Sequence, residues 1–523
     1  MKIALLVIYF GVMVAIGIYC RKHTSGINNF VLGGRSVGPW LTAFAYGTSY
    51  FSAVVFIGYA GQFGWKYGIA ATWAGIGNAI LGSLLVWVVL GRRTRIMTQH
   101  FDSTTMPQFF GQLFQSPSLK IGASIIIFIF LIPYTASLFN GLSRLFGMAF
   151  NIDYTVCIIL MGVLTGIYVI AGGYMATAIN DFVQGCIMLV GICAVVGAIL
   201  NTQGGFSEAL HNLAAVSDST TTNGDVPGIY ASFFGPEPVN LLGVVLLTSL
   251  GTWGLPQMVQ KFYAIKSEDA IHKGTVISTI FALVVSGGCY FMGGFGRLFS
   301  DQVDVATEGY DAIVPTMLSN LPELLIAIVV ILVLSASMST LSALVMTSSS
   351  TITLDLLKGN MVKKMNDFQA VFIIRCFIVV FIIISMVIAI IQYKYSISFI
   401  AQLMGVSWGA LAGAFLAPFL YGLYWKRVTP AAVWASFAAG VGITVSNMFL
   451  HYIESPINAG AFAMVAGLII VPLVSLLTTK MEPDYVNGIF ACYDDLVEAT
   501  SRKVLPDDKS FDSPAFQKKN KKH

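Results

Sequence analysis

A run of hydroxyl side chains inside an apolar, uncharged stretch is the feature of this chain that can do chemistry. Residues 335–353 contain eleven serines and threonines and continue the apolar run 324–333, which indicates a membrane-spanning helix. Hydroxyls in such a helix can bond back to a carbonyl one turn earlier, join neighbouring helices, or bind a dehydrated cation. Helix contact is the commonest of these uses, so further observations must decide between them.

Two hydroxyls of this run are well placed for a cation. Ser339 and Thr340 follow Ala336 by three and four residues, so their side chains lean back over its carbonyl. A sodium ion needs roughly six oxygen ligands, which hydroxyls and unpaired carbonyls can supply without charge. If the backbone of a facing helix is unwound at Thr48 and Phe51, the free carbonyl oxygens of these residues would complete the set of sodium ligands. Taken alone the pattern is a weak signal, because helices rich in serine and threonine commonly serve packing.

Two ionisable residues stand near apolar segments, where charge is costly. Asp181 follows the Gly172-Gly173 pair at the inner end of an apolar segment, and it can either line an ion path or cap a helix. Arg35 precedes another apolar segment and can act at a gate or as a positive anchor on the cytoplasmic side.

Aromatic and hydroxyl side chains mark candidate positions for a solute cavity. Tyr50, Thr252 and Trp253 lie close to two interrupted apolar segments, and Tyr134 follows Pro133 in the middle of another. Tyrosine and tryptophan are also common anchors at the membrane interface, so each of these residues alone is more often structural. Tyr134 differs because an interfacial position at mid-span is not expected.

An enzyme and a sensor are the competing classes of protein. The six histidines are isolated, and the sequence has no Ser–His–Asp set, nucleotide-binding glycine loop or cysteine pair at metal spacing. An intramembrane enzyme is therefore disfavoured, and the seven scattered cysteines are expected to be structural thiols. A sensor would need a signalling domain, and the polar tail 481–523 is too short to form one.

Composition places the chain in a membrane. Of its 523 residues 56% are hydrophobic and 10% are charged, and the mean hydropathy is +0.79. Because a span needs about 20 apolar residues, we expect an all-α integral membrane protein with thirteen transmembrane helices. The expected spans are 3–20, 39–63, 69–90, 119–149, 152–172, 178–200, 239–260, 274–296, 321–350, 368–391, 397–424, 430–451 and 458–478.

The distribution of basic residues predicts the orientation. The loops 201–238 and 299–318 contain no lysine or arginine, whereas basic residues cluster in the connections on the other side. The N-terminus is therefore expected outside and the C-terminus in the cytoplasm, in a multi-pass protein of a bacterial-type inner (cell) membrane. The first segment is expected to stay as a span, because it lacks a small-x-small cleavage site. The net charge of +4 comes from these flanks and implies no nucleic-acid partner.

Two apolar segments are interrupted in comparable ways. Residues 45–52 bring polar and glycine residues into the second segment, and residues 248–257 bring two glycines and a proline into the seventh. Such breaks are tolerated at membrane depth where the freed backbone groups face protein, ions or water and not lipid. Five segments separate the breaks, and this odd number predicts that the two halves enter the membrane from opposite sides. Paired breaks in inverted halves indicate a transporter with a site at mid-membrane, with ordinary kinks as the alternative.

Several motifs together resemble the sodium/solute symporter family, in the order that the family has them. A single motif of this kind would be weak evidence for the family, but the ordered set spread over residues 28–430 is specific to it. The motifs are Asn29–Ser36 (NFVLGGRS), Ile167–Gly173 (IYVIAGG), Asn180–Gln184 (NDFVQ), Met338–Ser342 (MSTLS) and Gly413–Lys426 (GAFLAPFLYGLYWK).

The resemblance implies a LeuT-type core of two inverted five-helix repeats, with sodium between the first broken helix and the helix of the hydroxyl run. Sodium would then be bound by the carbonyls of Thr48, Phe51 and Ala336 and the hydroxyls of Ser339 and Thr340. The family's substrate positions fall on Tyr134, Thr248, Thr252, Trp253 and Pro256, and its gating and ion-path residues on Arg35 and Asp181. Tyr50, beside the first break, is the sixth expected substrate residue and comes from the residue pattern alone.

The resemblance also divides the chain. The expected divisions are an N-terminal helix and loop (1–38), the first repeat (39–200), an extracellular loop (201–238), the second repeat (239–428), two additional helices (429–480) and a cytoplasmic tail (481–523).

The resemblance therefore implies a sodium-coupled symporter for a small organic solute, with Na⁺ as coupling ion and no cofactor. The protein is expected to be a monomer or weak homo-oligomer in the lipid bilayer. Members with proline as substrate carry an aspartate where this chain has Tyr50 and a tryptophan where it has Val54. Residues 49–58 look closer to the pantothenate and monocarboxylate members, which favours an organic anion. An amino acid such as proline and a sugar or sialic acid remain the alternatives. Proton coupling is less favoured, because hydroxyls and not a lysine or carboxylate stand at the expected ion site.

Overall fold

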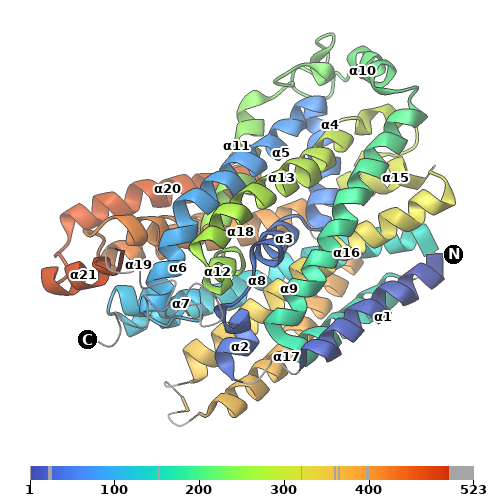
Figure 1. The fold of residues 1–523 in the computed structure, drawn as a ribbon. Helices are drawn as coiled ribbons and strands as arrows, with labels where there is room; N and C mark the ends of the chain where they lie inside the picture. The colour runs from blue at the N-terminus through green and yellow to red at the C-terminus, as the bar shows by residue number, and fades with distance from the viewer. Residues whose placement is uncertain are drawn as a thin grey trace.

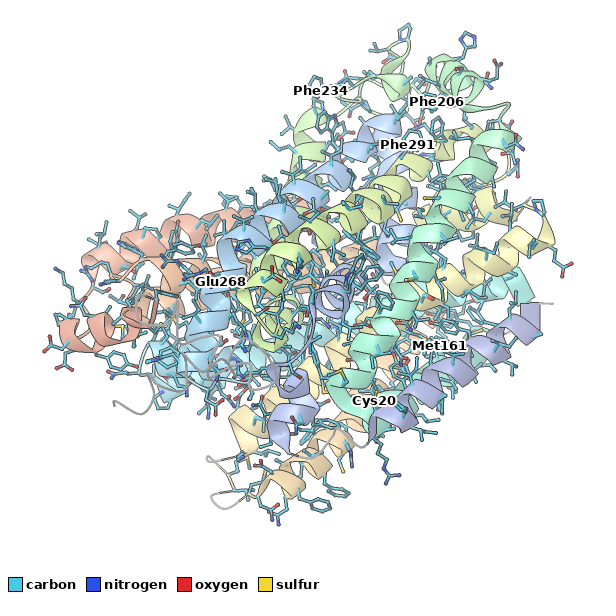
Figure 2. The ribbon with its side chains drawn as sticks, viewed as in Figure 1. Cys20, Met161, Phe206, Phe234, Glu268 and Phe291 are labelled. Carbon is cyan, nitrogen blue, oxygen red and sulfur yellow. The ribbon has the colours of Figure 1, made fainter. Side chains whose placement is uncertain are left out.

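The computed structural model describes residues 2–21, 26–150, 153–319, 321–358, 361–362, 365–395 and 400–493. Within these residues the chain forms a bundle of packed helices, and two isolated bridges are its only β pairing. Figure 1 shows α19–α21 at one edge of the bundle and α1 at the opposite edge. Figure 2 shows Phe206, Phe234 and Phe291 together at one end of the bundle, and Cys20 lies at the other end.

The helices follow the apolar segments closely. Their bounds are α1 Lys2–Cys20, α2 Ile27–Leu32, α3 Pro39–Tyr50, α4 Ala60–Tyr67, α5 Thr72–Ala79, α6 Arg92–His100, α7 Met106–Leu113, α8 Pro117–Phe150, α9 Tyr154–Thr202, α10 Phe206–Ala215, α11 Pro238–Leu250, α12 Pro256–Ala264, α13 Glu268–Gly293, α14 Val305–Glu308, α15 Ile313–Ser319, α16 Glu323–Thr351, α17 Asp367–Tyr395, α18 Ile400–Tyr424, α19 Pro430–Leu450, α20 Pro456–Leu477 and α21 Pro483–Phe490. Wider π turns occupy Val54–Tyr59, Ile80–Leu84, Trp87–Gly91 and Ile352–Leu357, and 3₁₀ turns occupy Gly33–Arg35, Gly68–Ala71, Ile229–Ala231, Gly251–Trp253, Gly296–Phe299 and Tyr310–Ala312.

Nine helices of the described residues are long and apolar enough to cross a membrane, and a bent pair formed by α11 and α12 makes a tenth candidate. The expected number of thirteen is not confirmed by this count. Two of the nine, Val54–His100 with 47 residues and Tyr154–Thr202 with 49 residues, each extend over two expected segments. The apolar part of α1, Ala4–Cys20, is shorter than a full span by the same measure.

Glycines change the chain direction inside the two longest helical segments. A straight 49-residue helix would be roughly 73 Å long, more than twice the hydrocarbon core of about 30 Å. Gly173 interrupts α9 with φ 55° and ψ −151°, and Gly68 ends α4 with φ 62° and ψ −144°. Glycine adopts such angles readily because it has no Cβ.

The first expected break lies at the end of α3. The helix stops at Tyr50, Phe51 is extended with φ −105° and ψ 100°, and helical structure resumes in the π turn that begins at Val54. Pro39 in the first turn of α3 suits a helix start, because its missing N–H has no partner there in any case. The unwound residues, Phe51 and Ser52, fall within the predicted range 45–52. Thr48 was also expected to be unwound, but it lies in the last turn of α3.

The second expected break separates α11 from α12. A 3₁₀ turn at Gly251–Trp253 is followed by extended Leu255 and by Pro256 at the first position of α12, and the two helices are bent by 41°. A side chain on Gly254 would stand 2.5 Å from the backbone nitrogen of Leu416 in α18. The glycine therefore allows the break to approach a neighbouring helix closely.

The helix that carries the hydroxyl run lies inside the bundle. α16 packs against α8, α9 and α3, and its residues from 332 to 351 are all buried. These hydroxyls therefore face protein and not lipid, so each needs a partner within the bundle.

Candidate functional site

Ser339 and Thr340 reach across from α16 to the first break. Both hydroxyls lie within hydrogen-bonding distance of the carbonyl oxygen of Thr48 in α3, at 3.2 and 3.0 Å, and of that of Ala336 in α16, at 3.2 and 3.0 Å. Thr48, Ala336, Ser339 and Thr340 are fully or almost fully buried. Four of the five residues expected to bind sodium thus meet in one small cluster that joins two helices.

Oxygen atoms are crowded in this cluster. Ser339 Oγ lies within 3.2 Å of three carbonyl oxygens, those of Thr48, Ser335 and Ala336, yet a hydroxyl carries a single hydrogen. Thr340 shares its one hydrogen between two carbonyls. Oxygen atoms thus outnumber hydroxyl hydrogens in this cluster, an arrangement that suits a small cation.

Phe51 lies beside the cluster at the break. It is the first residue beyond α3, its N–H donates to the Gly47 carbonyl over 3.0 Å, and its ring stacks on that of Tyr50 with centroids 4.2 Å apart. Because the chain is extended at Phe51, its carbonyl is not committed to the α3 hydrogen-bond ladder. Its service as a sodium ligand stays a prediction.

Three other hydroxyls of the run bond within their own helix. Ser337 donates to the Val333 carbonyl over 2.9 Å, Ser342 to Ser339 over 2.8 Å and Ser350 to Met346 over 2.7 Å. Such back-bonding is the ordinary use of a hydroxyl in an apolar helix.

Tyr50 connects the two breaks. Its hydroxyl donates to the Thr248 carbonyl at the end of α11 over 2.5 Å. The Thr248 hydroxyl turns back to the Val244 carbonyl over 2.8 Å, so its carbonyl and not its side chain faces the first break. Tyr50 and Thr248 are therefore brought together as the expected substrate site requires.

Thr252, Trp253 and Pro256 belong to the second break. Thr252 Oγ1 donates to the Gly82 carbonyl and Trp253 Nε1 to the Leu81 carbonyl, each over 3.0 Å, so both side chains hold the π turn at Ile80–Leu84. Pro256 is buried at the start of α12 and shapes the break. Thr252 and Trp253 bond to protein as described, and contact of any of the three residues with a solute stays a prediction.

Aromatic rings fill the space around Tyr50. The Trp408 ring of α18 lies with its centroid 6.1 Å from that of Tyr50 and 6.0 Å from that of Tyr134. The exposed fraction of each of these three residues is 1% or less. A solute that enters between the breaks must therefore displace at least one of these rings. Sequence reasoning missed Trp408, although its position in the middle of an apolar segment was the same signal that singled out Tyr134.

Asp181 pairs with a lysine that directly follows the expected span 239–260. Lys261 of α12 places its Nζ 3.7 Å from Asp181 Oδ2, and both side chains are buried. The same Nζ lies 5.3 Å from the centroid of the Tyr174 ring. Asp181 is thus more than a helix cap, because it joins the second part of α9 to the helix that follows the second break.

Arg35 connects its own turn before α3 to the loop at Ser103 and to the end of α12 at Tyr263. It has a positive φ of 57°, is buried, and donates to the carbonyls of Ser103 over 2.7 Å and Tyr263 over 3.4 Å. Burial lowers the pKa of the Arg35 guanidinium, while Asp102, 3.6 Å away, acts in the opposite direction. Arg35 contacts protein and not lipid, which does not fit a simple interfacial anchor.

An all-helical bundle with two broken helices and a buried oxygen cluster between helices is typical of secondary transporters. The sequence model of the Sodium:solute symporter family matches residues 30–440, and the chain belongs to this family. It is therefore a multi-pass membrane transporter that couples solute movement to sodium.

Similar proteins include named proline transporters. The chain is 28% identical over 482 residues to the osmoregulated proline transporter of Bacillus subtilis, covering 90% of this chain and 94% of the relative. It is 29% identical over 492 residues to a sodium/proline symporter of Staphylococcus aureus, covering 91% and 92%. These names give no support to the expected organic anion.

The fold is similar to that of a solved transporter. A structure of a Na⁺-coupled sialic acid symporter in a substrate-bound outward-open state matches with a TM-score of 0.74 and 17% identity, covering 92% of this chain and 98% of that one. At this identity the likeness concerns the fold. The division of this chain into two inverted repeats at the expected boundaries stays a prediction.

Proposed function

We propose that the protein imports a small organic solute together with sodium, which is bound by Thr48, Phe51, Ala336, Ser339 and Thr340. The observation that carries the proposal is the pair of α16 hydroxyls that share the Thr48 carbonyl at the end of a broken helix. A cation at this point would be coordinated by both helices at once. Its binding would hold the first break in one geometry and prepare the adjoining solute site.

The transport cycle follows from the positions of these groups. External sodium binds first and fixes α3 against α16, after which the solute enters between the two breaks. The bond from Tyr50 to the Thr248 carbonyl joins these breaks, so solute binding can be sensed by both halves. Opening of the inner side separates α12 from α9, breaks the Asp181–Lys261 pair and exposes Asp181 to the departing sodium ion.

For the substrate we propose a small organic anion related to monocarboxylates and pantothenate. The breaks leave two helix N-termini inside the bundle, at Val54 and at Pro256, and their partial positive charge favours a carboxylate. Proline is the second candidate, because the relatives are named for it and it carries the same carboxylate. A sugar would draw no benefit from these positive helix ends.

The sodium site is tested by the variant Ser339→Ala with Thr340→Ala. Loss of two ligands should raise the sodium concentration for half-maximal uptake by about tenfold for each 1.4 kcal/mol of binding removed, and sodium stimulation should disappear in the assay range. The matched control is Ser337→Ala with Ser342→Ala, which removes two hydroxyls that bond back within α16. Uptake should be measured in proteoliposomes against sodium concentration. Unchanged sodium stimulation in the first variant would refute the site.

The substrate class is tested by a thermal-shift screen of the purified chain. Carboxylates, proline and other amino acids, sugars and sialic acid should each be added with and without sodium. The solute that is transported should raise the Tm more in sodium than in its absence, because ligands that bind the folded state stabilise it. A shift with proline and none with organic acids would replace the first candidate by the second.

A further inference from the structure

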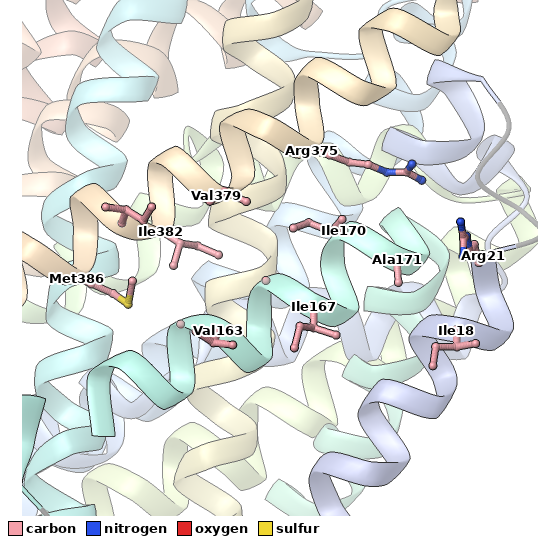
Figure 3. A pocket seen from close by; sticks show the side chains of 13 residues that line it. Ile18, Arg21, Val163, Ile167, Ile170, Ala171, Arg375, Val379, Ile382 and Met386 are labelled. Atoms are coloured by element: carbon pink, nitrogen blue, oxygen red, sulfur yellow. The ribbon is translucent and has the colours of Figure 1, made fainter. Parts of the chain in front are cut away.

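A groove of about 610 Å³ runs along the side of the bundle between α1, the first part of α9 and α17. Figure 3 shows Ile18 of α1, Ile167 of α9 and Ile382 of α17 around it. Ile18 and Ile167 are exposed on the surface of the bundle. The groove therefore opens towards the lipid that surrounds a membrane-spanning bundle.

Two glycines of α9 shape the groove, and a Cβ on Gly162 would stand 2.3 Å from Met386 Sδ, so that glycine lets α17 approach closely. Gly162 and Gly166 lie one helical turn apart in its lining. A Cβ on Gly166 would stand 3.5 Å from Ile382 Cδ1, and a larger side chain there would fill the groove. The interior is thus aliphatic and suits a hydrocarbon chain.

Two arginines close one end of the groove. Figure 3 shows Arg21, directly after α1, and Arg375 of α17 at the same end, with Met386 at the other. Arg375 forms no ion pair within the part of the chain that the structure describes, and its Nε is buried without a hydrogen-bond partner. Its guanidinium lies 5.3 Å from the centroid of the Phe30 ring, which leaves its other edge available.

The length of the groove matches one membrane leaflet. Eleven residues of α17 separate Arg375 from Met386, which is roughly 16 Å of helix. Half of a hydrocarbon core of about 30 Å is about 15 Å. Guanidinium groups at one end and an aliphatic floor over this distance suit a phosphate head group with its acyl chain.

We propose that this groove binds one anionic phospholipid. The phosphate is held between Arg21 and Arg375, and an acyl chain lies along Gly166 and Ile382 towards Met386. The charge distribution of the chain assigns this end to the cytoplasmic leaflet, where anionic lipids are recognised by basic residues. The lipid joins α1 and α17 to α9 and so stabilises the folded chain.

The test is the Tm of the purified full chain in detergent with added phosphatidylglycerol or phosphatidylcholine. Wild type should show a larger upward shift with phosphatidylglycerol, because at equal concentration the lipid that binds the folded state more tightly stabilises it more. Arg21→Gln with Arg375→Gln should lose most of this difference, and Arg21→Lys with Arg375→Lys should keep part of it. Lys273→Gln with Lys480→Gln is the matched control, because it removes two exposed charges elsewhere and should keep the full difference.

Further arms separate the lipid from other occupants. Gly166→Leu keeps both arginines but fills the groove, so it should also lose the difference between the two lipids. Glycerol phosphate, which has no acyl chain, should give no shift. An equal shift from glycerol phosphate, an unchanged difference in the glutamine variant, or no preference in the wild type would overturn the proposal. So would a dimer in which cross-links show this groove covered by a second copy.

Discussion

At the scale of single residues, the Asp181–Lys261 pair combines deep burial with loose geometry. Its atoms are 3.7 Å apart, and neither carboxylate oxygen of Asp181 has a hydrogen-bond partner among the described residues. Taking two charges out of water costs several kcal/mol, which such geometry offsets incompletely. A pair of this kind can separate more easily than a well-bonded one, as a gate requires.

We predict that Lys261→Met lowers the free energy of unfolding by about 3–5 kcal/mol, because it leaves a buried carboxylate without a partner. Adding Asp181→Asn should restore most of the loss, since the remaining charge is then removed as well. The control is the exposed pair Lys273–Asp269, where Lys273→Met should cost about 1 kcal/mol or less. Denaturant unfolding of the purified variants measures these differences. A stable Lys261→Met variant would show that Asp181 is hydrated or neutral in the folded protein.

A second prediction concerns the connection between the two breaks. Tyr50→Phe removes the hydrogen bond to the Thr248 carbonyl, and a net loss of about 1 kcal/mol should raise the solute concentration for half-maximal uptake roughly fivefold. Tyr46→Phe is the control, because Tyr46 donates to Gly82 within the first half of the chain. Equal effects of the two variants on uptake would mean that the connection between the breaks has no special role.

At the scale of elements, the sequence predicts those features that local chemistry determines. Polar residues and a glycine marked the first break, and two glycines and a proline marked the second. The three- and four-residue spacing after Ala336 marked the two hydroxyls that meet α3. Contacts between distant helices were not predictable in this way. Nothing local in the sequence pairs Lys261 with Asp181, eighty positions apart, or places Trp408 beside Tyr50. The turns at Gly68 and Gly173 fall inside continuous helical segments, which explains part of the difference between the thirteen expected spans and the nine long apolar helices. The short apolar part of α1 and the bend between α11 and α12 explain the rest.

Gly68 gives a prediction at this scale. Its backbone angles disfavour any side chain, and a Cβ there would stand 2.1 Å from the Tyr230 carbonyl oxygen. We expect Gly68→Ala to destabilise the protein by about 2 kcal/mol or more, through strain and displacement of the loop that contains Tyr230. Gly197→Ala is the control, because its Cβ would meet nothing within 4 Å and alanine favours a helix. The Tm of both variants should be measured by thermal unfolding, and equal Tm values for Gly68→Ala and Gly197→Ala would contradict the expectation.

At the scale of the whole molecule, the bundle must convert an ion gradient into accumulation of a solute. The electrical work is about 2.3 kcal/mol for each charge moved across 100 mV. One net positive charge per cycle therefore supports roughly fifty-fold accumulation at that potential. The net charge depends on the substrate, because an organic anion cancels one sodium ion and zwitterionic proline cancels none.

The last prediction uses this difference to identify the charge of the substrate. In proteoliposomes, the charge moved per solute and the sodium ions moved per solute can be measured on the same preparation. The first number minus the second equals the charge of the solute, whatever the number of sodium ions in the cycle. For the organic anion we expect minus one, and for proline zero. The same measurement with Ser339→Ala and Thr340→Ala should show loss of sodium flux and charge movement together, since both depend on the same ion. A difference of zero with a transported solute would refute the anion, and charge movement that persists without sodium flux would assign the coupling to another ion.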